Sequence, residues 1–240
     1  ISILIIFYLL PIVRYFWLSL HSSSVFTGLA LIPNNGSNWL RLLNDERFWL
    51  DSIQTLRFTF VSLSLELVLG LLLALFLNTK FSGRSFLRTA TLLPWALPTT
   101  VMALGWRWIF NSPHGIFDKL LVLIGLNPIN ILSNPNIAWF STVIGDVWKT
   151  TPFVTLILLA GLQTIPTELY EAYDLEGGNK KGSLFNITLP LLQPYILITV
   201  LFRLAQAIGV FEIIQVMTGG GPAGSTESLA LYAYLNAMRF

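Results

Sequence analysis

The sequence predicts an all-α protein, a polytopic bundle of transmembrane helices. Two properties of its composition point to this class: 54% of the residues are hydrophobic and only 11% are charged, whereas soluble proteins carry about 25% charged residues. The mean hydropathy of +0.69 agrees. Apolar runs of about 20 residues, enough to cross a bilayer as helices, also recur along the chain. Cysteine is absent, and a formal charge of +2 gives no indication of a nucleic-acid partner.

Five apolar runs have the length of a membrane span. They cover approximately residues 1–20, 52–78, 89–110, 137–162 and 191–217. Pro94 and Pro98 lie in the third run and should break or kink it, because proline removes a helical hydrogen bond. A last apolar stretch before Phe240 is too short to cross. We expect one transmembrane domain over residues 1–240, incomplete at both ends.

The basic residues of the loops predict an orientation. The loops after the second and fourth runs hold five basic residues, and those after the first and third hold three. In that order the residues are Lys80, Arg84, Arg88, Lys180 and Lys181, and then Arg41, Arg47 and Lys119. Cytoplasmic loops are enriched in Lys and Arg. We therefore expect a multi-pass protein of the plasma (inner) membrane, with the loops after spans two and four in the cytoplasm.

Ionisable residues inside the apolar runs are candidate functional or structural groups. An ionised side chain at the centre of a bilayer costs about 2.5–3.5 kcal/mol on insertion scales, so each should face protein or water. Asp146 and Lys149 are three residues apart and could pair. Glu66 should form an interhelical hydrogen bond. For Arg203 and Glu212, a pathway-lining role and a structural pair both stay open.

The segment 163–190 is a polar interruption between the fourth and fifth runs, and it predicts two short helices. Pro166 suits the first helical position, and Glu168 lies in the first turn, where a carboxylate complements the helix dipole. Gly177-Gly178 can end this helix in a left-handed conformation. A second short helix should run from about Asn179 to the Leu189-Pro190 pair. Such a helix-turn-helix on the membrane face is typical of a docking surface.

The same segment carries Glu171-Ala172-Tyr173, then Gly177, Ile187 and Leu189-Pro190. This pattern resembles the EAA loop of ATP-binding-cassette (ABC) importer permeases, although Tyr173 and Gly178 replace small alanine-like residues. An ordinary polar loop is the alternative. The resemblance implies the type I ABC importer permease fold, with a sixth span beyond Phe240. It also implies a set of ATPase-docking residues: Glu168, Glu171, Ala172, Tyr173, Asp174, Leu175, Gly177 and Phe185.

Three further segments resemble the carbohydrate-uptake branch of these permeases, nearest to trehalose or glucosylglycerol permeases. They are LLPWALPTTVMALGWRWIFN, DVWKTTPFVTLILLAGLQTIPTELYEA and TGGGPAGSTESLALY. The resemblance implies sugar-facing positions at Trp95, Thr99, Lys149, Thr150, Phe153, Arg203, Gln206, Ala207 and Val210. Ala207 and Val210 stand where the maltose type has amide side chains, which argues against maltose as the solute. The alternative for Trp95 is a packing or interfacial aromatic.

The chain itself is expected to be no enzyme, with no catalytic residue, no metal site and no bound cofactor. The string GGNKKGS is not a phosphate-binding loop, because Ser183 replaces the lysine that should follow the second glycine. The resemblance implies that a separate subunit binds ATP and Mg²⁺. The implied partners are a second permease subunit in a heterodimer, two ATP-binding subunits, an extracytoplasmic solute-binding protein and the lipid bilayer, with alternating access as the mechanism.

Other functions remain open from the sequence. A permease of another ABC importer, for phosphate or amino acids, would share the docking loop. An ion-coupled secondary transporter could relay ions through the carboxylates of Glu66, Asp146 and Glu212, and proline-broken spans would suit it. For a membrane-embedded enzyme, no nucleophile-base or metal constellation is found.

Overall fold

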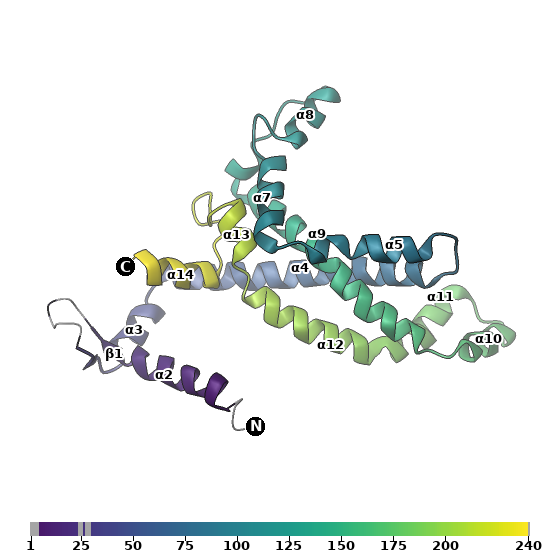
Figure 1. Ribbon diagram of the computed structural model, residues 1–240, viewed down its shortest axis with the longest axis horizontal. Coiled ribbons are helices and arrows are strands. Elements are labelled where there is room, and N and C mark those ends of the chain that lie inside the picture. The colour runs from purple at the N-terminus through teal and green to yellow at the C-terminus, as the bar shows by residue number, and fades with distance from the viewer. Residues whose placement is uncertain (1–4, 24–25, 27–29, 240) are drawn as a thin grey trace. The chain divides into compact units, whose positions relative to one another are not determined.

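The computed structural model describes residues 5–23, 26 and 30–239. The elements, in chain order, are η1 (Ile5–Leu9), α2 (Leu10–Ser19), β1 (His21–Ser22), β2 (Ile32–Pro33), α3 (Ser37–Leu43), α4 (Glu46–Asn78), α5 (Arg84–Thr91), α6 (Leu93–Ala96), α7 (Thr99–Ile109), α8 (Ile116–Leu123), η3 (Ile131–Ser133), α9 (Pro135–Gln163), α10 (Thr167–Leu175), α11 (Lys180–Ser183), η4 (Leu184–Thr188), α12 (Leu189–Ile208), α13 (Glu212–Met217) and α14 (Leu229–Arg239) (Figure 1). The predicted all-α class is confirmed. The chain divides between Leu50 and Asp51 into two compact units, each described by itself.

The first unit contains the first predicted span, of which the described residues form an apolar helix shorter than the candidate spans of the chain. The π-helix η1 and α2 form an apolar helix over Ile5–Ser19, and residues 1–4 of this run lie outside the described part. After α2, β1 and β2 pair as a two-residue antiparallel ladder. Asn38 of α3 donates to the carbonyl oxygens of Ser19 and His21 at 3.1 Å each, which ties α3 to the end of α2.

Of the four later predicted spans, three are unbroken helices and one is interrupted. Among the described residues, three helices are long and apolar enough to cross a membrane: Glu46–Asn78, Pro135–Gln163 and Lys180–Ile208. The third predicted span is broken into α5, α6 and α7, as its prolines predict. Pro94 lies in the first turn of α6 and Pro98 is the N-cap of α7. Leu97 between them is extended (φ −72°, ψ 138°), because a residue before proline disfavours the helical region.

Helix α9 is the centre of the second unit. In the apolar stretch of α9, 61% of the residues are buried. The corresponding share is 33% for α4 and 17% for the helix that ends in α12. Two glycines let the neighbouring helices approach. A Cβ on Gly70 of α4 would overlap Val154 of α9, and one on Gly161 of α9 would overlap Tyr195 of α12. Small residues at such crossings are the usual means of close helix packing in membranes.

Helices α4 and α9 run parallel. Arg57 lies over the Trp139 ring, Glu66 accepts from Thr150, and Gly70 meets Val154, so contacts advance along both helices in the same direction. The turn that follows α4 and the segment that follows α9 therefore lie at the same end of these helices (Figure 1). Helix α12 is antiparallel to α9, because Leu192 meets Gly161 while Arg203 reaches back to Asp146.

The fifth predicted span differs from the structure at both ends. The helix begins at Lys180 rather than at about residue 191, and it ends at Ile208 rather than at about residue 217. The predicted second short helix is thus not separate: α11 continues through the π-helical η4 into α12, with Pro190 in the first turn of α12. The chain leaves α12 at Gly209, and α13 begins at Glu212. Helix α13 packs with α7 and α14 around Met102, Ile214 and Leu231.

Candidate functional site

A polar cavity of about 440 Å³ lies in the second unit where α9, α12, α13 and the break before α7 meet. The residues that line it are Trp95, Thr99, Asp146, Lys149, Thr150, Arg203, Gln206, Gly209, Val210, Phe211, Glu212 and Ile213. Two breaks in the chain's helical path serve this cavity, one at Pro98 and one at Gly209. The α6–α7 break brings Trp95 and Thr99 to it, and the break after α12 brings the segment from Gly209 to Ile213.

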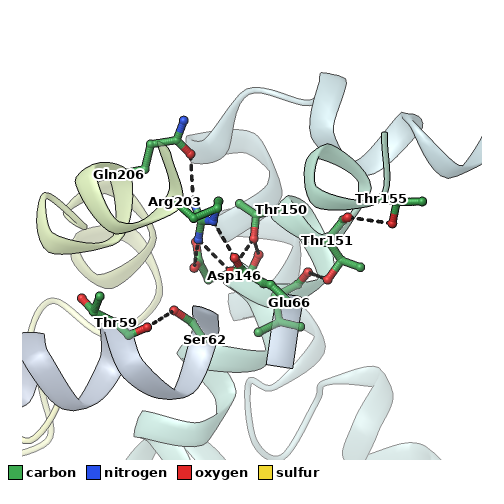
Figure 2. A network of polar contacts seen from close by, with 10 residues as sticks. Thr59, Ser62, Glu66, Asp146, Thr150, Thr151, Thr155, Arg203 and Gln206 are labelled. Atoms are coloured by element: carbon green, nitrogen blue, oxygen red, sulfur yellow. Dashed lines mark hydrogen bonds and ion pairs between the residues drawn. The ribbon is translucent and has the colours of Figure 1, made fainter. Parts of the chain in front are cut away.

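The floor of the cavity is a buried ion network around Arg203 of α12. Its Nε donates to Glu66 Oε2 at 2.5 Å and its Nη2 to Glu66 Oε1 at 2.7 Å, a bidentate contact. The same Nη2 donates to Asp146 Oδ2 at 3.0 Å, and Nη1 donates to Gln206 Oε1 at 2.9 Å. The Thr150 hydroxyl lies 2.7 Å from Glu66 Oε1. Figure 2 shows these side chains converging from α4, α9 and α12.

This network explains how the chain holds charges between membrane helices. Glu66 is 0% exposed and Arg203 2%. Isolated charges there would be costly, whereas here each charged group lies against a group of opposite charge, and further hydrogen bonds join them to Asp146, Gln206 and Thr150. The expected interhelical hydrogen bond of Glu66 is confirmed, and its partners are Arg203 and Thr150. Arg203 both forms a structural pair and lines the cavity.

The predicted pairing of Asp146 with Lys149 is wrong. Asp146 pairs with Arg203 instead. Lys149 Nζ donates to the carbonyl oxygens of Leu97 at 2.9 Å and Trp95 at 3.4 Å. These carbonyls lie at the proline break, where the α-helical hydrogen bonds are interrupted and backbone acceptors become free. Lys149 thereby ties the α6–α7 break to α9.

Of the nine positions proposed to face a sugar, seven line the cavity: Trp95, Thr99, Lys149, Thr150, Arg203, Gln206 and Val210. Phe153 is not among the lining residues, but its ring stacks on that of Trp95, with the ring centroids 5.9 Å apart. Ala207 is buried at 2% exposure and does not reach the cavity wall.

Sequence reasoning missed four lining residues: Asp146, Gly209, Phe211 and Ile213. Glu212, for which a pathway-lining role was left open, also lines the cavity. A signal for Asp146 was present, because it precedes Thr150 by four residues and so shares a helix face with it. Gly209, Phe211, Glu212 and Ile213 were placed inside a continuous span, and only the end of α12 at Ile208 brings them to the cavity.

The segment 163–190 forms the predicted exposed helix and turn. Helix α10 follows Pro166, which is its N-cap rather than its first residue, and Gly177 ends it with φ +82°. The left-handed stop is therefore confirmed. Seven of the eight predicted docking residues are exposed: Glu168, Glu171, Ala172, Asp174, Leu175, Gly177 and Phe185. Leu175 is 90% exposed. Tyr173 differs, because its side chain is turned toward α11 and η4.

A polar cavity among membrane-spanning helices, with an exposed helix at one end of them, defines a class of protein. The cavity can receive a small polar molecule away from lipid, and the end helix can receive a partner. The fold and the site together define a transmembrane permease.

The chain belongs to the family of binding-protein-dependent transport system inner membrane components, whose model matches residues 66–240. It is accordingly an ABC transporter permease, and the expected EAA loop fits this family. The trehalose/maltose transport system permease protein of Thermococcus litoralis is 44% identical over 97% of this chain and 79% of its own length. The sulfoquinovosyl glycerol transport system permease protein of Agrobacterium fabrum is 37% identical over 96% and 75%.

A solved structure supports the fold. It is the crystal structure of a bacterial alginate ABC transporter in complex with an alginate pentasaccharide-bound periplasmic protein. One of its chains matches with a TM-score of 0.77 and 25% sequence identity, over 87% of this chain and 73% of that one.

Proposed function

We propose that this chain is the permease subunit of an ATP-driven importer that takes up a sugar, disaccharide or polyol-type osmolyte of the trehalose or glucosylglycerol class by alternating access. The observation that carries the proposal is the polar cavity of about 440 Å³, which falls within the usual size of small-molecule sites, about 300–1,000 Å³. The 44% identical relative, a trehalose/maltose permease, supports the choice of solute.

The charges of the cavity favour an uncharged solute. Its lining holds two acidic and two basic side chains, Asp146, Glu212, Lys149 and Arg203. Arg203 is engaged by Glu66, Asp146 and Gln206, and Lys149 by two backbone carbonyls. No net positive charge is left in this lining to attract a carboxylate, phosphate or sulfonate, which supports a neutral sugar over an anionic solute.

The proposed roles of the lining residues follow from their chemistry. Trp95, backed by Phe153, covers the apolar face of a sugar ring, while Thr99, Gln206 and Arg203 give directional hydrogen bonds to hydroxyl groups. Lys149 and Thr150 complete the polar side, and Val210 lines the wall. Ala207 is proposed to contribute only through its small size, because a larger side chain at this buried position would displace α12.

The proposed cycle needs partners that supply ATP hydrolysis. Nucleotide binding closes two ATP-binding subunits, which hold the ATP and Mg²⁺, and α10 rides in a groove of one of them. Movement of α10 turns the spanning helices and opens the cavity toward an extracytoplasmic solute-binding protein; hydrolysis reopens it inward. The second permease of the heterodimer completes the passage. This chain binds no cofactor and carries out no chemistry.

The proposed orientation places α10 in the cytoplasm of a cell whose inner membrane holds the protein. Lys80 follows α4 directly, and Arg84 and Arg88 of α5 donate to the carbonyl oxygens of Thr79 and Leu77 at the end of α4. This is the end of the helices at which α10 lies (Figure 1). An excess of basic residues marks the cytoplasmic side, so the charge pattern and the need for an ATPase at α10 favour the same orientation.

The test is to purify the complex with its binding protein and measure which sugars or polyols stimulate ATP hydrolysis. We expect stimulation by a neutral disaccharide or glycosyl polyol and none by phosphate or amino acids. Stimulation by phosphate or an amino acid alone would overturn the carbohydrate assignment. Uptake that persists with an inactive ATPase would overturn ATP-driven import and favour an ion-coupled transporter.

A further inference from the structure

Tyr173 is the one predicted docking residue whose side chain faces into its own loop. Its hydroxyl oxygen accepts a hydrogen bond from Asn186 Nδ2 at 2.9 Å, and so links α10 to η4. One turn earlier on α10, the Tyr170 hydroxyl lies 3.0 Å from the Thr188 hydroxyl, also in η4. Residues three apart share a helix face. Two tyrosines on one face of α10 therefore hold it against η4.

The loop leaves space for the Tyr173 ring by means of two glycines. A Cβ on Gly178 would overlap two ring carbons of Tyr173 and its carbonyl oxygen. A Cβ on Gly182 would overlap the Tyr173 hydroxyl oxygen, and the next nearest atoms would be Asn179 Oδ1 and Tyr173 Cζ, both at 3.3 Å. Neither glycine has a left-handed backbone. Glycine is required at both positions because a Cβ would occupy the space of the Tyr173 side chain. Tyr173, Gly178 and Gly182 therefore form one packing unit.

Through η4, the packing unit of Tyr173, Gly178 and Gly182 is connected to the cavity. Residues Lys180–Ile208 form one helix that begins beside α10 and ends at the cavity. Near its far end, Arg203 and Gln206 line the cavity. A displacement of α10 transmitted through the two tyrosines would act on the helix that carries these side chains. A loose connection would let α10 move without α12.

We propose that Tyr173 is a positioning residue that couples α10 to the cavity-lining helix, and that it is not itself a contact to the ATPase. Gly182 leaves the space that the Tyr173 hydroxyl occupies. The Tyr170–Thr188 contact is a second link between α10 and η4. The inference rests on the proposed import function and adds the route by which the movement of α10 reaches the solute.

The test is a double-mutant cycle on the reconstituted complex with its binding protein. The variants are Gly182→Ala, Tyr173→Phe and both together, and the readout is solute taken up per ATP hydrolysed. Helix propensity alone would make Gly182→Ala favourable. We expect it instead to lower uptake per ATP by about fivefold or more, because an overpacked contact displaces its neighbour. Tyr173→Phe removes the overlapping oxygen, so the double variant should return to the level of Tyr173→Phe alone.

A second cycle covers the case in which Gly182→Ala does not accumulate. Tyr173→Phe and Asn186→Ala each remove the same hydrogen bond, so each should lower uptake per ATP by about two- to tenfold, with no further loss when they are combined. Gly105→Ala in α7 is the matched control, because no atom lies within 4 Å of the added Cβ.

The outcomes separate this inference from the proposed function. Additive losses in either cycle, or unchanged uptake per ATP in Gly182→Ala, would overturn the role of Tyr173. Loss of the ATPase subunits from purified Tyr173→Phe complex would show that Tyr173 is a docking contact. A wild-type complex that no sugar stimulates would instead refute the carbohydrate function, whatever the variants do.

Discussion

The cavity and the α10 segment are both joined to the long helix Lys180–Ile208, yet they are built by different means. The cavity depends on buried charges that meet from three helices, with Arg203 and Glu66 separated by 137 residues in sequence. The α10 segment depends on neighbours: Pro166 before the helix, Gly177 after it, and Tyr173 packed on glycines five and nine residues further on. A solute site must exclude lipid on all sides, whereas a docking helix must stay exposed. Changes in the buried ion network should therefore mainly affect folding, and changes at the α10 segment should mainly affect coupling.

The largest effect on stability is expected for Glu66→Ala. This change leaves the buried Arg203 without its bidentate partner, and breaking a buried pair in this way costs about 3–5 kcal/mol. The thermal midpoint of the detergent-solubilised complex should fall sharply. A triple variant that removes all three charges, Glu66→Leu with Asp146→Leu and Arg203→Met, should recover most of this stability without recovering uptake. An unchanged midpoint for Glu66→Ala would contradict the importance of the ion network.

The next effect is expected for Gly177→Leu at the end of α10. Its φ of +82° is unfavourable for a residue with a Cβ, at a cost of about 1–2 kcal/mol. ATP hydrolysis should continue while uptake per ATP falls. Gly177→Asn is the matched control, since asparagine tolerates the left-handed conformation. Wild-type stimulation and uptake in Gly177→Leu would refute the need for a rigid turn.

Lys149→Met tests the link between α9 and the α6–α7 break. It removes the hydrogen bonds to the carbonyls of Leu97 and Trp95, each worth about 0.5–1.5 kcal/mol. Because Trp95 lines the cavity, we expect the concentration for half-maximal uptake to rise by about tenfold at most, with a smaller change in maximal rate. A variant with unchanged uptake kinetics would show that the lysine does not shape the cavity.

The smallest effect on stability is expected for Leu175→Ser. Leu175 is 90% exposed, so its loss should change the free energy of unfolding by about 0.5 kcal/mol or less. Recovery of the ATP-binding subunits with the purified permease should nevertheless decrease, because Leu175 is one of the proposed docking residues and its exposed side chain would pack against the ATPase. Leu123→Ser on α8, where the side chain is 80% exposed, is the matched control. Equal recovery in both variants would argue against docking through Leu175.

Much of the α10 segment could be predicted, because its determinants are local. The stop at Gly177 follows from the backbone preference of a single residue, and so does the break at Pro94 and Pro98 in the third span.

The end of α12 at Ile208 could not be predicted in this way. Apolar composition continues to Met217, so hydropathy alone extends the span. In the structure the Ser228 hydroxyl donates to the carbonyl oxygen of Val210 at 2.7 Å, just beyond the end of the helix.

The sequence by itself determined the membrane class, the broken third span and the exposed helix that carries the family pattern, because composition and local backbone chemistry dictate these features. The tertiary structure alone decided which charges meet. Asp146 pairs with Arg203 rather than with Lys149, three residues away. In a membrane helix a buried charge is stabilised by the partner that packing brings to it, and that partner can come from any other helix.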